Sequence, residues 1–577
     1  MGSNKTTPID LPVADDAELT LLHMYGDQPW RLNRRQLVTA LGVAVAGAAL
    51  GTGVSAAPGS GNRANLVSAQ ATGKIVTADN GDVDTIDLHY FKSIPGYYAV
   101  ANLYDNLFGY EYHEVETGGL KPVEESPGNW KLLPWLLESW EVSPDQKTIT
   151  FKLRKDVVFS DGTPMTANDV KASWDRGVSD TSVYSKLVFG LMTVSRPDQI
   201  QVTDDYTVIL TLDKPTVFAL KMIAVNVLDI MSAKAIEEHA TADDPTAATW
   251  FQQNALGSGP YVMSKWTPGV EWDFDPNPNY WNKDALKNVG VINRMIPNPQ
   301  ERLSLLQNGD IDVAFHLLPK DLGALRDNPD VTLYDFRVPR VQFMQMNNTI
   351  PPFDNPDVRR AVCHAIPYQT LIDQVMFGFA EPLKSPIPPG MPTSDESFWA
   401  YDGGPAKAKE LLATAGVTNL EFELAVRPIF PEFEQDAVWI QSGLQEAGVN
   451  VKITKMTETE YLDKFVAGQL QAALGEWYSW INDPIYHLYW NFLSVSTATN
   501  GARYNNKQVD DIIMSALYET DLAKREQLSK QAQQIIVDEA PWAFLYKKND
   551  VVAARKNIKS VNWNTDEAPR YWIVTKE

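Results

Sequence analysis

Residues 139–170 have the sequence SWEVSPDQKTITFKLRKDVVFSDGTPMTANDV, in which three kinds of local structure follow one another. Hydrophobic and polar residues alternate over residues 149–153, which predicts a β-strand of period two. The pair at residues 161–162, Asp-Gly, is typical of a turn. Thr166, with the acidic Asp169 three positions later, predicts the N-terminus of a helix. A strand, a turn and a helix in close succession indicate a fold that mixes helices and strands.

The same alternation continues along the chain. A helix is predicted to begin at Pro299 and to end at Gly309, and a strand follows at residues 311–315. Further helices are predicted at about residues 355–365, 405–415, 433–447, 458–469, 507–517 and 522–539, with a strand at 449–453. No fixed-period repeat occurs, which argues against solenoids and propellers. The sequence therefore predicts an α/β or α+β architecture with more than one lobe.

A series of short motifs, in a fixed order, is more specific than any element alone. The motifs are residues 139–145, 150–155, 159–164, 167–170, 257–261, 277–281 and 307–312, then Asn347 with residues 352–354 and 358–361. Together they resemble the signature of family 5 of the extracellular solute-binding proteins, the dipeptide- and oligopeptide-binding class of ABC importers. The resemblance extends over about residues 75–575.

The resemblance implies an α/β, two-lobed periplasmic binding protein fold of type II, with an extra subdomain inserted in the first lobe. Lobe I is expected at residues 74–115, 251–340 and 546–577, the inserted subdomain at 116–250 and lobe II at 341–545. Such proteins close around a ligand in the cleft, because a ligand that contacts both lobes favours the closed state. A membrane permease then recognises the closed form.

The densest aromatic stretch of the chain begins with WYSWINDP at residues 477–484. In the family, a Trp and an acidic-Pro pair bracket a ligand-contacting loop, so the resemblance places Trp477, Tyr478 and Asp483 in the binding site. Family members that bind free peptides typically carry an Asp three residues after this Trp, which pairs with the ammonium of the peptide. Here that position is Trp480, whose flat indole would suit stacking on a sugar or covering an apolar group.

Four candidate ligand contacts have structural alternatives. Asp483 is expected either to contact the ligand or to cap the turn made by the proline that follows it. Tyr98 is expected either to face the cleft or to pack in the core of lobe I. Arg427 could bind an anion or remain solvated, and Asn347 is expected to serve the hinge backbone more than the ligand.

Composition limits the function of the protein. The 577 residues include 50 Lys and Arg against 73 Asp and Glu, a net charge of −23, which argues against binding to nucleic acid or to anionic lipid. The single cysteine, Cys363, excludes an intrachain disulfide, and the seven histidines are dispersed without the paired spacing of a metal site. Phosphate-binding loops and nucleophile motifs are also absent from the sequence. We therefore expect no metal, no cofactor and no catalytic residue.

The N-terminal region predicts export. Arg34 and Arg35 precede an uncharged run at residues 37–54, which small residues follow. These are the parts of an export signal, and the paired arginines resemble a twin-arginine signal. Residues 1–57 are therefore predicted to be the signal, and residues 58–73 a linker. If the signal were not cleaved, its apolar run would tether the protein to the membrane.

These features favour a monomeric solute-binding protein, periplasmic or at the cell surface, that delivers a solute to ABC permease subunits. A peptide is the favoured ligand, because peptides are the ligands of most family members, and an oligosaccharide is the alternative. An acidic, Trp-rich exported chain is also compatible with a glycoside hydrolase, whose two catalytic carboxylates would lie about 5–10 Å apart.

Overall fold

The computed structural model describes residues 19–21, 30–32 and 73–577, except residues 127, 180–182, 428, 429 and 498. The predicted export signal and linker lie outside these residues, apart from Gly73 and the strands β1 (Leu19–Leu21) and β2 (Trp30–Leu32), which pair antiparallel. Among the helices that the structure describes, none combines the length and the apolar character needed to cross a membrane.

A mixed sheet of eleven strands organises the fold. The strand order is β14, β15, β16, β3, β17, β23, β18, β22, β20 and β21, and β19 is added beside β23. The bounds are β3 (Ile75–Asp79), β14 (Tyr261–Thr267), β15 (Glu271–Pro276), β16 (Val291–Met295), β17 (Val313–Ala314), β18 (Val331–Met346), β19 (Ala380–Pro382), β20 (Glu421–Val426), β21 (Asn450–Lys455), β22 (Ala472–Tyr478) and β23 (Trp542–Arg555). β3 pairs in parallel with β16 and β17, and β20 with β21 and β22, as in α/β folds.

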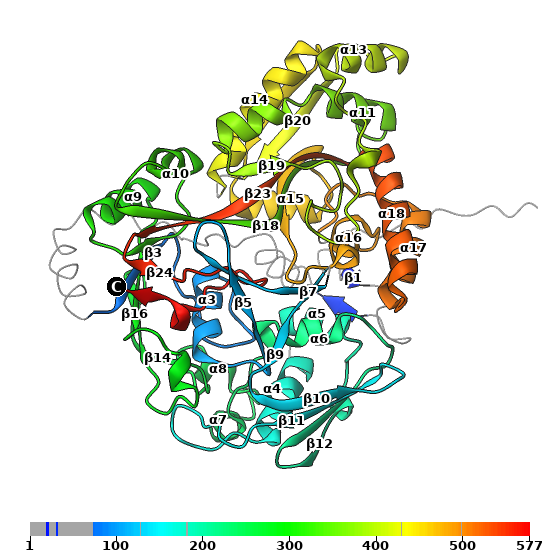
Figure 1. Ribbon diagram of the computed structural model, residues 1–577. Coiled ribbons are helices and arrows are strands. Elements are labelled where there is room, and N and C mark those ends of the chain that lie inside the picture. Colours follow the sequence, from blue (N-terminus) through cyan, green and yellow to red (C-terminus); the bar gives the residue numbers. More distant parts are fainter. Residues whose placement is uncertain are drawn as a thin grey trace, which may run out of the picture.

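The two longest strands, β18 and β23, join the two ends of this sheet, and we call them the hinge strands. They pair antiparallel from Val331 opposite Arg555 to Gln345 opposite Trp542, with irregularities between Arg337 and Arg340 and between Gln342 and Phe343. β3 and β14–β17 lie beyond β23, and β20–β22 lie beyond β18; we call these sides lobe I and lobe II (Figure 1). The predicted lobe boundaries after residues 340 and 545 fall inside the hinge strands and stay predictions.

Helices cover this sheet, and seven of them begin and end close to where the sequence predicts. α9 (Pro299–Asn308) begins after Asn298, whose side-chain oxygen accepts hydrogen bonds from two backbone N–H groups, and it ends at Gly309, with a φ of 79°. The other predicted helices are confirmed as α11 (Pro356–Ala365), α13 (Gly404–Thr414), α14 (Pro431–Glu446), α15 (Glu458–Val466), α17 (Lys507–Tyr518) and α18 (Leu522–Glu539). α16 (Pro484–Phe492) was not predicted; all its residues are buried, so no exposed polar face marks it as a helix.

A separate four-stranded antiparallel sheet lies within the segment predicted as the inserted subdomain, in the lower part of Figure 1. Its order is β10 (Leu137–Val142), β11 (Thr148–Leu153), β13 (Thr207–Thr211) and β12 (Ile200–Asp204). β11 confirms the predicted strand at residues 149–153, and its apolar residues are buried. α4 (Ala167–Ser179) follows as predicted, and the Asp169 carboxylate accepts a hydrogen bond of 2.7 Å from the backbone N–H of Thr166.

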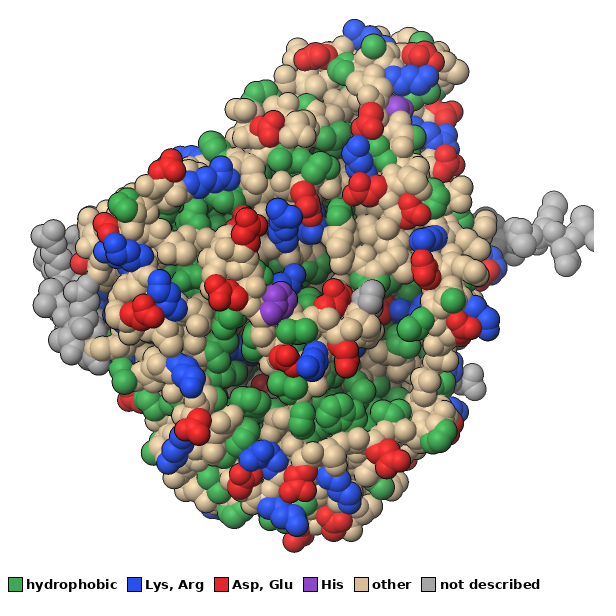
Figure 2. Space-filling model, viewed as in Figure 1, with side chains coloured by type: hydrophobic (Ala, Val, Ile, Leu, Met, Phe, Trp, Pro, Cys, Tyr) green, Lys and Arg blue, Asp and Glu red, His purple; other side chains and the backbone are tan. Residues whose placement is uncertain are grey.

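Charges of both signs are mixed on the surface. Figure 2 shows basic and acidic side chains interspersed over the face in view. In the structure as a whole, ion pairs also join successive helical turns, such as Lys507 with Asp511 at 2.6 Å. On this face the excess of acidic residues is therefore distributed among basic ones.

Candidate functional site: a cavity between the lobes

A cavity of about 280 Å³ lies where the hinge strands and both lobes meet. Lobe I contributes residues of α3 (Ile94–Leu103) and of the loop after β17, and lobe II contributes the end of β22 and the start of α14. The hinge strands supply Arg340 and residues 548–552. A further wall is formed by residues 562–570, which we call the C-terminal loop. A ligand in this cavity would touch both lobes, which is the condition for ligand-induced closure.

Five charged side chains form a network along the cavity wall. The guanidinium of Arg340 lies 2.5 Å from the carboxylate of Glu567, in the C-terminal loop, and 3.4 Å from that of Glu476, in β22. The ammonium of Lys548 lies 3.3 Å from Glu476 and also contacts Glu432, in α14. None of these side chains is more than 20% exposed. The network therefore joins the C-terminal loop to lobe II through the hinge strands.

The lining has more acidic than basic groups. The acidic residues are Glu432, Glu476, Asp550, Asp566 and Glu567, and the basic residues are Arg302, Arg340 and Lys548. Burial raises the pKa of Glu567 to about 7, although Arg340 acts in the opposite direction, and the charge of Asp550 adds to the rise. Such a cavity favours a cationic group over an anionic one.

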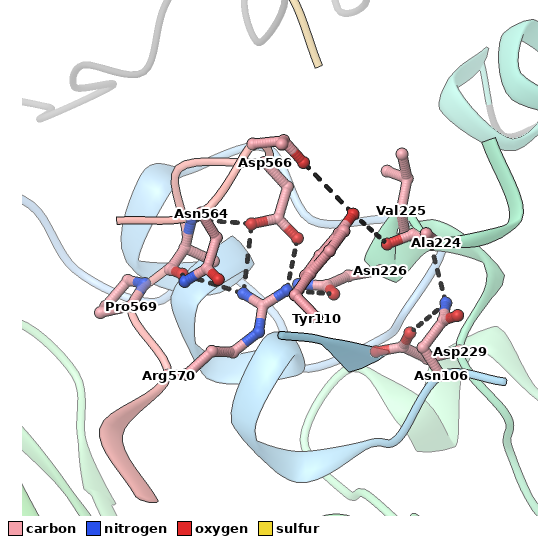
Figure 3. A network of polar contacts seen from close by, with 12 residues as sticks. Asn106, Tyr110, Ala224, Val225, Asn226, Asp229, Asn564, Asp566, Pro569 and Arg570 are labelled. Atoms are coloured by element: carbon pink, nitrogen blue, oxygen red, sulfur yellow. Dashed lines mark hydrogen bonds and ion pairs between the residues drawn. The ribbon is translucent and has the colours of Figure 1, made fainter. Parts of the chain in front are cut away.

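Buried polar contacts fix the C-terminal loop (Figure 3). The Arg570 guanidinium donates hydrogen bonds of 2.6 and 3.2 Å to the two carboxylate oxygens of Asp566, and one of 3.0 Å to the side-chain oxygen of Asn226. Glu567, which follows Asp566 in the chain, has a φ of 62°, in the left-handed region that residues other than glycine rarely adopt. Strained backbone of this kind is often found at functional sites, where the surrounding structure holds it.

The aromatic residues predicted as ligand contacts differ in where they lie. Tyr98 and Tyr478 line the cavity. Because strand residues alternate between faces, Glu476 shares a face with Tyr478, and Trp477 points to the other side of the sheet. Trp480 lies next to Tyr478, and its indole N–H donates a hydrogen bond of 3.1 Å to the Tyr478 hydroxyl. Neither Trp is among the described residues that line the cavity, and their direct ligand contacts stay predictions.

Asp483 is held by protein groups. Its carboxylate caps α16 by accepting a hydrogen bond of 2.9 Å from the backbone N–H of Ile485, and it lies 2.7 Å from Arg525 and 3.2 Å from Lys221. The side chain is only 1% exposed. Although burial acts in the opposite direction, Arg525 and Lys221 hold the pKa of Asp483 well below its usual range. The structure thus shows the capping alternative, at a helix rather than at an isolated turn.

Arg427 and Asn347 also lie among protein groups. Arg427 is completely buried, and its guanidinium lies over the rings of Tyr461 and Phe430, 4.9 and 5.4 Å from their centroids. The solvated alternative for Arg427 is therefore wrong. The amide of Asn347 donates a hydrogen bond of 3.0 Å to the backbone oxygen of Gly468, so this residue serves the backbone beside the hinge strand β18, as expected.

The inserted segment touches lobe II beyond the cavity. In the hairpin of β7 (Glu124–Ser126) and β8 (Asn129–Trp130), the Glu124 carboxylate accepts a hydrogen bond of 3.0 Å from the Asn482 amide. A Cβ added at Gly128 would lie 2.8 Å from the backbone oxygen of Asn482 and 2.7 Å from Pro392, so glycine permits this approach. In α6 (Ala219–Ile223), Lys221 reaches Asp483. The inserted segment thus contacts lobe II at residues 482 and 483.

The charged residues of the cavity were not among the predicted contacts. The spacing of Lys548 and Asp550 does indicate that their side chains lie on one face, because residues two positions apart in a strand share a face. Glu476 also precedes the aromatic stretch directly. No local pattern in the sequence indicates that Arg340 and Glu567 meet, because these two residues are 227 positions apart.

The structure also describes the side chains that could bind a metal ion and the single cysteine that could act as a nucleophile. Within the described residues, no group of three or more His, Cys, Asp or Glu side chains is arranged to hold a metal ion. Cys363 is buried, and burial raises the pKa of its thiol to about 12, so that little reactive thiolate forms at neutral pH.

Known proteins resemble this chain over most of its length. Residues 131–499 match the model of the bacterial extracellular solute-binding proteins, family 5. A probable D,D-dipeptide-binding periplasmic protein of Escherichia coli is 32% identical over 438 residues, which cover 74% of this chain and 82% of that protein. Heme-binding protein A of Haemophilus influenzae is 28% identical over 444 residues, which cover 73% of this chain and 80% of that protein.

A solved structure agrees with these matches. The ABC transporter-associated periplasmic binding protein DppA of Helicobacter pylori, in complex with the peptide STSA, superposes with a TM-score of 0.73 at 25% identity, covering 88% of this chain and 98% of that one. Its fold is the two-lobed type II fold, which confirms the fold predicted from the motifs. The family match covers more than half of the chain and includes the hinge strand β18 and β22. The chain belongs to family 5 of the bacterial extracellular solute-binding proteins, and it is a substrate-binding component of an ABC importer rather than an enzyme.

Proposed function

We propose that this protein captures a short peptide in the cavity between its lobes and delivers it to the importer's permease. The cavity itself carries the proposal, because its volume of about 280 Å³ suits a small ligand and its lining combines aromatic, acidic and basic groups. A free peptide presents an ammonium, a carboxylate and polar peptide groups, which such a lining can bind. The D,D-dipeptide-binding relative and the STSA complex support this choice.

Two other ligands are less well supported. The indole of Trp480 was the reason to consider an oligosaccharide, but Trp480 bonds to Tyr478 and is not among the described cavity-lining residues. Heme carries two carboxylates, which the excess of acidic groups in the lining would repel.

Ligand binding to the purified protein tests the proposal. We expect alanyl-alanine, in its L,L or D,D form, or methionyl-leucine to raise the melting temperature, because a ligand at 100 times its Kd adds about 2.7 kcal/mol to the free energy of unfolding. Cellobiose, xylobiose and hemin, at the same concentration, are the comparison ligands. Stabilisation by a sugar or by hemin, with no response to any peptide, would contradict the proposal.

We also propose that residues 1–57 direct export and that the protein acts as a monomer outside the cytoplasmic membrane. The paired arginines before the apolar run and the extracellular family support this location. Replacing Arg34 and Arg35 by lysine is expected to leave the precursor in the cytoplasm, as measured by cell fractionation. Normal export of this variant would rule out the twin-arginine route, and a dimer mass in light scattering would contradict the monomer.

A further inference from the structure

Backbone strain marks one residue of the cavity wall, His316. It follows β17 on the lobe I side of the cavity, and its φ is 54°, in the left-handed region. The guanidinium of Arg302, in α9, holds this turn by donating hydrogen bonds of 3.0 Å to the backbone oxygen of Phe315 and 2.7 Å to that of His316. Arg302 is only 2% exposed. Strained backbone that a buried group holds in place is often found at functional sites, so the His316 side chain is a candidate ligand contact.

A buried carboxylate orients the ring of His316. The Nδ1 atom of the ring lies 3.2 Å from Oδ1 of Asp79, at the end of β3, and the Asp79 side chain is completely buried. A carboxylate can only accept hydrogen bonds, so Nδ1 carries the proton of the neutral ring. The second nitrogen, Nε2, therefore keeps a lone pair and acts as a hydrogen-bond acceptor.

The Nε2 atom of His316 is open to a ligand. Among the described residues it has no hydrogen-bond partner, and it is accessible rather than buried. The side chain is 29% exposed, although the Nδ1 edge of the ring faces the buried Asp79. The accessible edge is thus the one that carries Nε2, on a residue that lines the cavity. The structure therefore presents one oriented acceptor to a molecule that binds there.

The His316 ring is neutral at pH 7.5, as an acceptor at Nε2 requires. Burial lowers the pKa of His316 below its usual value of 6.5. The guanidinium groups of Arg302 and Arg340 act on this pKa in the same direction. The carboxylates of Asp79 and Asp550 oppose these effects without reversing the shift. Protonation in acid would turn Nε2 into a donor, so the ring accepts a hydrogen bond there only above its pKa.

We propose that Nε2 of His316 accepts a hydrogen bond from the N–H group of a peptide bond in the ligand. Asp79 acts as a positioning residue, which keeps the lone pair directed into the cavity. This assignment rests on the proposed peptide-binding function and restricts its substrate class to peptides with an unsubstituted peptide N–H. A neutral acceptor suits this neutral donor, whereas an ammonium group is attracted more strongly to the carboxylates of the lining. An analogue without the N–H would leave Nε2 unpaired, and a site built around a hydrogen bond discriminates against such an analogue.

Isothermal titration of the complete mature protein at pH 7.5 tests this assignment. The probes are alanyl-alanine and alanyl-lactate, in which an ester oxygen replaces the peptide N–H, each in its L,L and D,D forms. The variant is His316→Asn, because asparagine tolerates a positive φ and can place an amide near Asp79 but has no atom in the place of Nε2. We expect the ester to bind the wild type about 5- to 30-fold more weakly than the dipeptide, and the variant less than about threefold more weakly.

The control and the contrary outcomes separate this inference from the proposed function. His113→Asn, at an exposed histidine of β5 (Tyr112–Glu114) outside the cavity lining, should behave as the wild type. If the dipeptide binds but the ester loses equal affinity in the wild type and in His316→Asn, the peptide function stands and the assignment of His316 is wrong. If neither dipeptide binds to the wild type, the peptide function fails and the inference fails with it.

A measurement on the ligand-free wild type tests the role of Asp79 separately. Nitrogen-15 NMR of histidine-labelled protein distinguishes a ring protonated at Nδ1 from one protonated at Nε2, and the spectrum of His316→Asn identifies the signal of His316. We expect the Nδ1–H form at pH 7.5, because Asp79 accepts that proton in a hydrogen bond. A ring protonated at Nε2 would present a donor to the cavity and would overturn the inference.

Discussion

Replacing Asp483 by alanine is expected to lower the free energy of unfolding by about 3–5 kcal/mol at pH 7, the usual cost of breaking a buried ion pair from one side. The variant leaves the guanidinium of Arg525, which is only 8% exposed, without its carboxylate partner. It also removes the N-cap of α16, worth a further ~1 kcal/mol. Urea titration followed by tryptophan fluorescence measures the loss.

Two further measurements show whether the ion pair causes this loss. Lys221→Met removes only the partly exposed ammonium group that contacts Asp483, so we expect the free energy of unfolding to fall by at most about 1 kcal/mol. Because the pKa of Asp483 is held below its usual range, its contribution is complete above the unfolded-state pKa of about 3.9 and decreases as the pH falls below that value. Equal losses in the two variants, or a difference between wild type and Asp483→Ala that grows in acid, would contradict this explanation.

Replacing Arg340 by glutamine is expected to destabilise the protein by about 3–5 kcal/mol at pH 8, because two buried carboxylates lose their shared cation. Glu476 and Glu567 are 6% and 11% exposed at their side chains, and they belong to β22 and to the C-terminal loop. Lys548 remains within 3.3 Å of Glu476 but makes no ion pair with Glu567 in the described structure. Glu567 is therefore the carboxylate that loses its cation in this variant, whereas Glu476 keeps Lys548.

The loss in Arg340→Gln is expected to depend on pH in a defined direction. Without Arg340, the folded-state pKa of Glu567 should rise above its present value of about 7, whereas the unfolded-state value stays near 4.3. Between these values the folded state binds more protons, so the stability of the variant falls as the pH rises. The loss should thus be smaller at pH 5 than at pH 8. Arg337→Gln, on the same strand but exposed, is the matched control, and a loss independent of pH would show that packing is the cause.

Much of the secondary structure could be predicted because its signals are local. Asn298 and Gly309 mark the two ends of α9 by the chemistry of their own backbone and side chains. The alternation in β11 is visible because one face of that strand is buried. β17 was predicted at residues 311–315 but has only two residues, Val313 and Ala314. Local pattern therefore predicts the kind of element better than its length.

The site was harder to predict because its parts are distant in the sequence. The family resemblance led to Tyr98 and Tyr478, but the network around Arg340 depends on a C-terminal loop for which no local pattern exists. Asp483 was placed near the ligand because an acidic residue before a proline fits both a binding loop and a helix cap. Only the positions of Arg525 and Lys221 distinguish the two, and neither is close to Asp483 in the sequence.

The position of β23, later in the sequence than the strands it pairs with, also affects how the protein is made. β23 pairs with β17, β18 and β19, and the C-terminal loop follows it, so both lobes and the cavity stay incomplete until residues 542–577 leave the ribosome. Until then the nascent chain exposes the edge of β18, which is the kind of unpaired strand that promotes aggregation. Completion of the fold therefore has to wait until residues 542–577 have been made, and the edge of β18 is unpaired over that interval.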